Sequence, residues 1–352
     1  MKAALDTAEG DLERQIVDFL AERLEAKRWT KTQFWRSVEG FSWETYQVGL
    51  DWTASDGDHS GGFIVHRVPS AGLLRPYRPR ALFELRSSIG ALTTVPIPAT
   101  LWLDEDGTAT GRPLYVVERV VGDVPTQWSS DGFFSDDSQR TQIADQLMEI
   151  TAILHAAPLT LAPSGIRGAS EHDALAEVRY WYDIYMNEDL GPEPILDYGF
   201  AWLFANSQDV SGRLAVLHGD LRTGNYMVRD GRIVALLDWE ESHVGDPVQD
   251  LAHCALRLFR GRTRQPSGLV PLNELLAAYE RAAGWEVPQA AFHYWTVFEA
   301  VYTAITQHRA AAIFAAGETD DVRYAALGSQ VHYNHRFVID AIESAELGEV
   351  PK

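Results

Sequence analysis

The sequence predicts an α+β protein in which a small antiparallel sheet domain precedes a larger helical domain. Residues 40–121 contain short runs of β-branched and aromatic residues, separated by turn-forming pairs such as Asp56-Gly57, which is typical of antiparallel strands. The rest of the chain repeats its apolar residues mostly at helical spacing. Because 352 residues exceed the length of an average domain, we expect two domains, at residues 1–121 and 122–352.

The N-terminal domain is expected to begin with a helix, because residues 11–26 place Ile16, Leu20 and Leu24 on one helical face. The β-type runs predict strands, and one helical segment interrupts them. The strands are expected at Thr45–Val48, Phe63–Val68 and Tyr115–Val121, and the helix at Ala81–Leu92. A short link near 118–125 then leads into the second domain.

The C-terminal domain is expected to be helical apart from a β-like patch at residues 225–238. The apolar pattern predicts helices at about 138–156, 171–187, 193–206, 247–260, 271–283, 287–313 and 319–346. A sheet domain beside a helical domain leaves a cleft, and ligand sites tend to lie in such clefts. We therefore expect the functional site between the two domains.

Composition and charge exclude several classes of function. Hydrophobic residues make up 46% of the chain, which is enough for a sizeable core. A total of 30 Lys and Arg residues against 50 Asp and Glu residues gives a net charge of −20, so neither nucleic acid nor an anionic membrane is expected as a partner. No apolar stretch reaches the length of a signal peptide or a membrane helix, and we expect a soluble, cytoplasmic protein.

The single cysteine, Cys254, excludes an intramolecular disulfide and a metal site built from several thiolates. We expect it to be a small buried hydrophobic residue. The histidines at 243, 253 and 293 lack the spacing of a zinc-binding helix, so we assign them no metal. The aromatic cluster of Trp181, Tyr182 and Tyr185 is expected in the core, with an aromatic wall of a substrate pocket as the alternative.

The most informative stretch is 217–252, which contains a predicted β-hairpin. Two apolar runs flank Asp230-Gly231, the strongest short-range hairpin signal. If these two residues form the turn, Arg229 faces Arg232, and counting outward places Asn225 opposite Leu236 and close to Asp238. An amide oxygen and a carboxylate at that separation are hard oxygen ligands suited to Mg²⁺.

Asp220 lies just upstream, in a loop with His218 and Gly219, and is expected to meet a substrate at the same end of the hairpin. Any one of the residues Asp220, Asn225 and Asp238 could instead be a turn former or a helix cap. Because the hairpin geometry brings all three together, we predict a metal and phosphate site.

The motifs in this stretch resemble the catalytic core of the aminoglycoside phosphotransferase family, which has a bilobal protein-kinase-like fold. They are His218-Gly219-Asp220 followed by Asn225, then Leu237-Asp238-Trp239-Glu240, then Gly245-Asp246-Pro247 with Asp250. The resemblance covers roughly residues 35–345, and it is closest to members related to the kinase-like domains of acyl-CoA dehydrogenase fusions. We expect Asp246 and Asp250 to cap or anchor the helix that begins near Pro247.

The resemblance implies a role for each residue of the core. Asp220 would orient the attacking hydroxyl and accept its proton, and Arg222 would add positive charge within the same loop. Asn225 and Asp238 would hold the Mg²⁺ ions that bridge the phosphates of ATP. The implied cofactors are therefore ATP and Mg²⁺.

The resemblance also implies a nucleotide site in the first domain. The segment 40–46 matches the loop that covers the phosphates, where the hydroxyls of Ser42 and Thr45 are available. The following strand normally carries a lysine that pairs with the phosphates, but the chain has no lysine between residues 40 and 122. Strand alternation puts Val65 and Arg67 on one face, and we prefer Arg67 to His66 as the replacing cation because its guanidinium is always charged.

Arg67 could alternatively be a solvated residue at the sheet edge, in which case nucleotide binding would be weak or the chain inactive. The family pairs this cation with an acid on the next helix, and Glu84 is the best match, with a surface role as the alternative. Residues 114–120 resemble the strand and hinge whose backbone binds adenine, which implies contacts from Glu118 and Val120.

The function predicted from these residues is an ATP- and Mg²⁺-dependent phosphotransferase that acts on a hydroxyl of a small molecule. The acceptor would be an aminoglycoside-like antibiotic or a hydroxylated acyl metabolite, bound by segments between 171–206 and 246–310. The alternative is a catalytically silent nucleotide-binding module, which the missing lysine favours. We expect a monomer or a homodimer. The sequence contains neither the G-x-S-x-G motif of serine hydrolases nor the G-K-[ST] of a P-loop.

Overall fold

The computed structural model describes residues 2–37, 40–126, 136–188 and 190–349 and divides the chain into two units. The sheet unit comprises Met1–Ser87 and Pro98–Val120, and the helical unit comprises Ser88–Ile97 and Val121–Lys352. The division after Val120 lies one residue from the predicted boundary. The segment Ser88–Ile97 differs from the prediction, because it belongs to the helical unit although it precedes two strands of the sheet.

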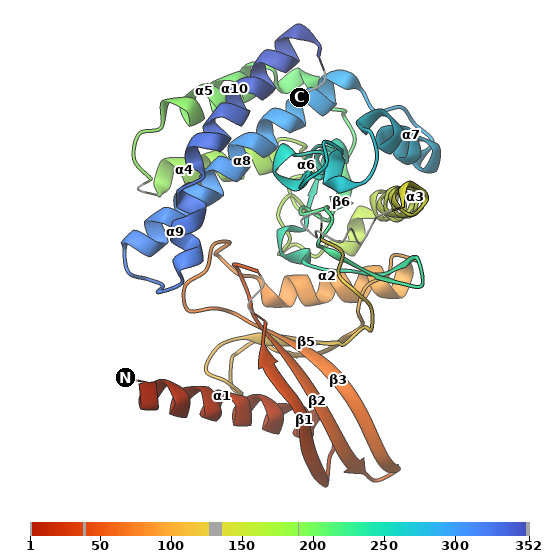
Figure 1. Cartoon of the computed structure of the whole chain (residues 1–352), viewed down its shortest axis with the longest axis vertical. Helices are drawn as coiled ribbons and strands as arrows, with labels where there is room; N and C mark the ends of the chain where they lie inside the picture. Colours follow the sequence, from red (N-terminus) through yellow and green to blue (C-terminus); the bar gives the residue numbers. More distant parts are fainter. Residues whose placement is uncertain (1, 38–39, 127–135, 189, 350–352) are drawn as a thin grey trace. The chain divides into compact units, whose positions relative to one another are not determined.

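The sheet unit contains one five-stranded antiparallel sheet with the strand order β1-β2-β3-β5-β4 (Figure 1). The strands are β1 (Arg28–Arg36), β2 (Glu44–Ala54), β3 (Gly57–Arg67), β4 (Thr100–Asp104) and β5 (Leu114–Glu118). Between β3 and β4 the chain forms helix α2 (Pro79–Leu92). The sequence did not predict β1, because an exposed, polar edge strand lacks the apolar alternation of a half-buried one.

One face of the sheet is covered by α1 (Lys2–Arg23), which begins earlier than predicted. Ile16 and Leu20 of α1 are fully buried against a cluster that includes Val48 of β2 and Val65 of β3. Because side chains alternate along a strand, His66 projects to the opposite face from Val65 and Arg67. The covering helix therefore decides which residues of β3 remain on the face available to a ligand.

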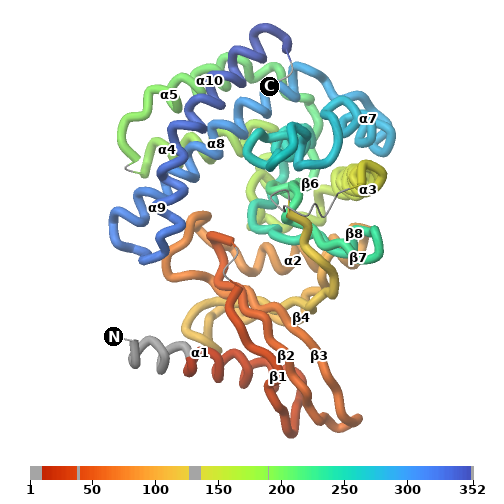
Figure 2. The backbone as a smooth tube through the Cα atoms, viewed as in Figure 1, coloured from red at the N-terminus to blue at the C-terminus, as the bar shows by residue number. Residues whose placement is uncertain are grey.

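The helical unit is built around α8 (Gln289–Ala315), a 27-residue helix whose side chains are buried on nearly every side. Such all-round burial marks the centre of a helical core. Figure 2 shows α8 among the other helices of the unit. The other helices are α3 (Asp137–His155), α4 (Ala176–Asn187), α5 (Pro194–Ala205), α6 (Val248–Cys254), α7 (Leu272–Ala283), α9 (Val322–Gly328) and α10 (Val331–Leu347). The strands are β6 (Ala215–Leu217), β7 (Tyr226–Arg229), β8 (Arg232–Leu236) and β9 (His243–Gly245).

Two of the predicted helices are shorter or divided in the structure. The predicted helix 247–260 ends at Cys254 and is followed by a short 3₁₀ turn, Arg257–Phe259. The predicted helix 319–346 is two helices, α9 and α10, separated at Ser329 and Gln330. Cys254 is fully buried, as predicted. Within the described residues, no helix is both long and apolar enough to cross a membrane.

Candidate active site

The catalytic loop, residues 218–225, follows β6 and is fixed by a buried acid. The Asp250 carboxylate accepts hydrogen bonds from the backbone N–H groups of His218 at 2.9 Å and Gly219 at 2.8 Å. Burial alone would raise the pKa of Asp250, but the hydrogen bond with His155 and the nearby His218 lower it to about 2. Asp250 therefore anchors the loop and not the start of α6. Asp246 does cap α6, as predicted, by accepting the Val248 N–H at 3.0 Å.

Gly219 and His218 determine the conformation of the catalytic loop. Gly219 has a φ of 84°, and a Cβ at this position would lie 2.2 Å from the Glu241 carbonyl oxygen. Only glycine fits there. Burial lowers the pKa of His218, so its ring is neutral: Nε2 donates to the Leu237 carbonyl at 2.7 Å, and Nδ1 accepts from the Asp220 N–H at 3.3 Å. His218 thus ties Asp220 to the end of the hairpin.

The side chain of Asp220 is the centre of a charged cluster. Its Oδ1 accepts from Arg222 Nε at 2.8 Å and from His253 Nε2 at 2.9 Å, and its Oδ2 accepts from Asn225 Nδ2 at 2.5 Å. Burial would raise the pKa of Asp220, but Arg222 and His253 outweigh it and hold that pKa well below its usual range. The side chain is still 23% exposed, so a substrate hydroxyl has a route to it.

His253 was assigned no role from the sequence, yet it connects Asp220 to a second buried acid. Its Nδ1 lies 2.7 Å from Glu299 Oε2 on α8, and its Nε2 contacts Asp220. Burial would lower the pKa of His253, but Glu299 and Asp220 raise it to about 10. His253 is therefore protonated at neutral pH and donates to both carboxylates. This role could not be predicted from a sequence motif, because the three residues are far apart in the sequence and meet only in the folded protein.

The predicted β-hairpin is confirmed, with a register that differs from the predicted one by one residue. Asp230 and Gly231 form the two-residue turn, both with positive φ, and Arg229 pairs with Arg232. A bulge between Met227 and Val228 then shifts the pairing, so Tyr226 and not Asn225 lies opposite Leu236.

The bulge leaves Asn225 beside the end of β8. Its carbonyl oxygen accepts the Leu237 N–H at 2.8 Å, which places its backbone next to the residue that precedes Asp238. Asp238 is exposed and has a left-handed backbone, with φ of 54° and ψ of 57°. Burial alone would lower the pKa of Arg222, but the carboxylates of Asp220, Asp238 and Glu240 raise it. The negative charge of Asp238 therefore interacts with the positive charge of Arg222 in the catalytic loop.

In the sheet unit, the position of Arg67 differs from the predicted one. Its guanidinium is buried, and all three nitrogens are used: Nη1 bonds Glu44 Oε2 at 2.6 Å, while Nε and Nη2 bond the hydroxyl and carbonyl oxygens of Thr110. The predicted pair with Glu84 does not form. Glu84 is half-exposed and lies 3.5 Å from Arg80, one turn earlier on α2.

Arg67 and Val65 project to the side covered by α1, where Val65 is fully buried in the core. The face that strand alternation assigns to the nucleotide is therefore the face against which α1 packs, and the sequence did not show this packing. The opposite face of β3 carries His66, whose pKa is lowered to about 3 by burial and by the nearby charge of Arg86. His66 is neutral and contacts the Thr45 hydroxyl at 3.2 Å.

Arg86 of α2 is a residue of the sheet unit that no sequence motif indicates. It is only 3% exposed, and its guanidinium carbon lies 5.7 Å from the centre of the Tyr115 ring. Among the described residues, no acid pairs with it, and its Nε has no hydrogen-bond partner. A buried guanidinium without a counter-ion is unusual, because burying an unpaired charge is costly. Such a group is suited to bind an anionic ligand.

The remaining predicted nucleotide residues occupy different environments. Ser42 is buried, and its carbonyl oxygen accepts the Tyr77 hydroxyl at 3.0 Å. Glu118 uses its backbone N–H for Ala99, at 2.9 Å, and its side chain accepts the Ala99 N–H. Val120 is half-buried at the end of the sheet unit. Their predicted contacts with a nucleotide stay predictions.

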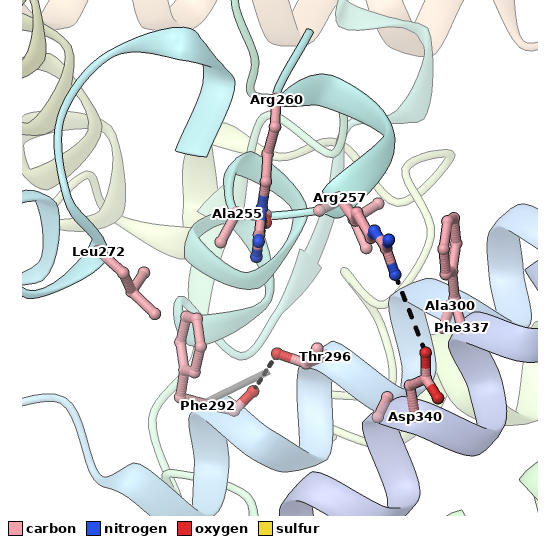
Figure 3. Close-up of a pocket in the computed structure, with 11 residues that line it drawn as sticks. Ala255, Arg257, Arg260, Leu272, Phe292, Thr296, Ala300, Phe337 and Asp340 are labelled. Atoms are coloured by element: carbon pink, nitrogen blue, oxygen red, sulfur yellow. Dashed lines mark hydrogen bonds and ion pairs between the residues drawn. The ribbon is translucent and has the colours of Figure 1, made fainter. Parts of the chain in front are cut away.

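The helical unit contains a pocket that is lined by residues between Ala255 and Ala341 (Figure 3). Its lining does not include Asp220, Asn225 or Asp238. Phe292, Phe337 and the ion pair of Arg257 with Asp340 line it. Its volume of about 50 Å³ is far below the roughly 300 Å³ at which small-molecule pockets begin. In this form it does not hold a nucleotide or a sugar.

The aromatic cluster at 181–185 belongs to the core. Trp181 is 1% exposed and Tyr185 is buried, and the Trp181 Nε1–H donates to Glu177 at 2.8 Å. Tyr182 packs edge-to-face against Phe200 and Phe204. The predicted core role is therefore confirmed for Trp181 and Tyr185.

Comparison with known proteins decides the family. The model of the phosphotransferase enzyme family, which includes aminoglycoside phosphotransferases, matches residues 39–293, well over half of the chain. This chain belongs to that family. The predicted family and the kinase-like α+β fold are both confirmed, and phosphotransfer is the chemistry that the family shares.

Among curated relatives, acyl-CoA dehydrogenase family member 11 from Rattus norvegicus is 25% identical over 238 residues. The match covers 64% of this chain and 30% of the rat protein, so the chain spans less than a third of that relative's length. The resemblance to the kinase-like part of acyl-CoA dehydrogenase fusions is thereby confirmed.

Solved structures of the phosphotransferase family share the fold. A candidate aminoglycoside phosphotransferase from Ralstonia eutropha superposes with a TM-score of 0.69 at 18% identity, covering 95% of this chain and 98% of that chain. A thermostable mutant of another aminoglycoside phosphotransferase, in a ternary complex with ADP and hygromycin B, gives a TM-score of 0.54 at 17% identity, covering 91% of this chain and 97% of that chain.

Proposed function

We propose that this phosphotransferase moves the γ-phosphate of ATP to a hydroxyl group of a small molecule and requires Mg²⁺. The observation that carries the proposal is the catalytic loop, in which Asp250 fixes the backbone and Asp220 stays ionised and partly exposed. Transfer of a phosphoryl group needs mainly positioning and charge neutralisation, which an anchored loop of this kind can supply.

Asp220 acts chiefly by orienting the acceptor hydroxyl. A carboxylate whose pKa lies well below its usual range is a weak general base, because bases work best when their pKa is near the working pH. A loose transition state for phosphoryl transfer demands little activation of the nucleophile. Asp220 would therefore accept a hydrogen bond from the hydroxyl and take its proton late, while Arg222 and His253 keep the carboxylate in place.

Mg²⁺ would be held by Asn225 and Asp238. Asn225 donates to Asp220 through Nδ2, which leaves its Oδ1 as the atom for a metal, and Asp238 offers an exposed carboxylate. Oxygen atoms of this kind are the ligands that Mg²⁺ prefers. When bound, the ion would neutralise charge on the β- and γ-phosphates.

Arg86, in place of Arg67, would supply a phosphate-binding cation from the sheet unit. The guanidinium of Arg67 is already bonded to Glu44 and Thr110, whereas Arg86 is buried without a counter-ion among the described residues. A guanidinium binds phosphate oxygens through two hydrogen bonds at once, and it remains charged when buried. This assignment removes the objection that the chain lacks a lysine in this region.

For the acceptor, we propose a hydroxylated acyl compound first and an aminoglycoside second. The name of the rat relative refers to acyl-CoA chemistry, and the ternary complex of the solved relative contains hygromycin B. Both compound classes carry hydroxyl groups that a phosphoryl group can reach.

The experiment is incubation of the protein with ATP, Mg²⁺ and a panel of hydroxylated acyl compounds and aminoglycosides, followed by mass spectrometry. We expect one acceptor class to gain the mass of one phosphate. Asp220→Asn should slow this gain by about 10²- to 10⁴-fold, the range for loss of a general acid–base group. Asp230→Asn is the matched control, since Asp230 is exposed in the hairpin turn and asparagine accepts its positive φ.

The second candidate function is a nucleotide-binding module without turnover, and it applies if Arg86 does not replace the lysine that is absent between residues 40 and 122. That reading predicts that ATP binds but that no acceptor gains phosphate, with the same result in wild type and Asp220→Asn. An acceptor that is phosphorylated only by the wild type would exclude it.

A further inference from the structure

Three side chains of the helical unit converge outside the catalytic loop. Glu193 immediately precedes α5, His308 lies in the C-terminal half of α8, and His335 lies in the first turns of α10. The two histidine Nε2 atoms are 3.2 Å apart. The two carboxylate oxygens of Glu193 each lie 3.6 Å from one of them.

Hydrogen bonding accounts for only part of this arrangement. One imidazole can donate to the other across 3.2 Å, but a carboxylate oxygen 3.6 Å away makes no hydrogen bond to either ring. Four-coordinate Zn²⁺, with bonds of about 2.0–2.2 Å, places its ligand atoms roughly 3.3–3.5 Å apart. The three separations lie close to that value, with one carboxylate oxygen of Glu193 facing each histidine. One ligand atom from each of the three residues lies within 4.8 Å of the other two, so a small rotation of the carboxylate would let all three share one ion.

The surroundings hold the three groups and leave an entry path. Arg309, the neighbour of His308, forms a two-bond ion pair with Glu188 at 2.7 and 2.9 Å. The Tyr185 hydroxyl lies 3.3 Å from the Glu193 carbonyl oxygen and donates to Asp197, which fixes the start of α5. The Glu193 side chain is 25% exposed and those of the two histidines are 12% and 15% exposed, so an ion can reach them from solvent.

We propose that Glu193, His308 and His335 bind one Zn²⁺ ion, with water in the fourth position. Imidazole and carboxylate ligands in a tetrahedral arrangement are typical of zinc. The ion would join the start of α5 to α8 and α10, which lie side by side in the helical unit (Figure 1). Its role would be to stabilise this group of helices, at a site separate from the catalytic loop.

The test uses the full chain without an affinity tag, stripped of metal, and measures Zn²⁺ affinity by competition with a coloured chelator. We expect one Zn²⁺ per chain and a higher Tm in its presence. His335→Ala should weaken binding by about 100-fold or more, because it removes one of three protein ligands. Glu193→Gln preserves the size of the side chain, removes its charge, and should weaken binding at least 10-fold.

The matched control is His59→Ala, which removes a histidine that contacts a single carboxylate, Asp56, at 2.9 Å in the sheet unit. This variant should bind Zn²⁺ as tightly as the wild type. Circular dichroism and Tm of the metal-free variants show whether each is folded, so a lost ligand is distinguished from a lost fold. Equal Zn²⁺ affinity in the wild type, Glu193→Gln and His335→Ala would overturn the proposal.

Discussion

The catalytic loop in the helical unit and the end of β3 in the sheet unit both carry charged residues that the sequence assigns to phosphoryl transfer. In the loop, Asp220 is partly exposed and its charged partners leave it accessible. At the end of β3, Arg67 is buried on the side of α1, and its guanidinium is fully occupied by Glu44 and Thr110. The same type of inference from a motif thus leads to a partly exposed acid in one region and to a buried ion pair in the other.

The difference comes from what each motif constrains. The loop motif includes residues that fix the backbone, such as Gly219 at its positive φ and Asp250 at two backbone N–H groups. Because the backbone of the loop is fixed, the position of the Asp220 side chain is fixed as well. A strand motif fixes only the alternation of side chains, and the identity of the buried face depends on what packs against it.

The largest expected effect concerns His253, which links the catalytic loop to α8. Its pKa of about 10 in the folded protein lies above the value of 6.5 for an unperturbed histidine. Its stabilising contribution is therefore complete below pH 6.5 and is lost as the pH rises through about 10. Urea unfolding should show His253→Gln less stable than the wild type at pH 6 by about 3–5 kcal/mol.

The difference between wild type and His253→Gln should then shrink between pH 6 and pH 10.5, since both proteins share every other titrating group. A difference that stays constant over this range would show that His253 is neutral in the folded protein. In that case the two carboxylates, Asp220 and Glu299, would not be bridged by a cation.

The second effect concerns metal binding at the hairpin. Asp238→Asn should weaken the affinity for ATP–Mg²⁺ by about 100-fold, because the variant loses the charged metal ligand. Asparagine also accepts the left-handed backbone of this residue, so the fold is preserved. Calorimetric titration with and without Mg²⁺ measures this effect, and an unchanged dependence on Mg²⁺ in Asp238→Asn would remove the assigned role.

The third effect separates the two buried arginines of the sheet unit. Arg86→Met should weaken ATP binding by about 10-fold, the low end for a lost charged hydrogen bond, with little change in stability. Arg67→Met should leave ATP affinity within about threefold and cost about 2–3 kcal/mol of stability, below the cost of fully breaking a buried pair. Arg112 limits the loss, because it still pairs with Glu44 at 2.9 Å.

Nucleotide affinity and urea unfolding, measured on both arginine variants, give the two readouts. If Arg67→Met lost ATP affinity and Arg86→Met kept it, the original assignment from the sequence would be correct after all. The contrast between the two motifs would then no longer hold, because each would have identified a residue that functions in phosphoryl transfer.

Much of the fold follows from sequence patterns, and the errors have physical causes. The hairpin turn at Asp230 and Gly231 is predictable because both residues need positive φ. The bulge that shifts Asn225 by one residue leaves no mark in the apolar alternation. The edge strand β1 was not predicted because its side chains face solvent.

The site could be predicted only where neighbours in sequence are also neighbours in space. His218, Asp220 and Asn225 lie within eight residues of each other, so the motif contains them all. The partners of His253 come from the catalytic loop and from α8, and Arg86 is distinguished by a buried Nε that has no hydrogen-bond partner among the described residues. Neither the contacts of His253 nor the environment of Arg86 can be predicted from a short stretch of sequence.

The most direct test of phosphotransfer is to compare ATP–Mg²⁺ affinity and turnover in one preparation of Asp220→Asn. If Asp220 orients the acceptor hydroxyl and does not hold the nucleotide, calorimetry should give an affinity within about threefold of the wild type while turnover falls by at least about 10²-fold. Turnover equal to that of the wild type, with acceptor and ATP both saturating, would contradict the role of Asp220.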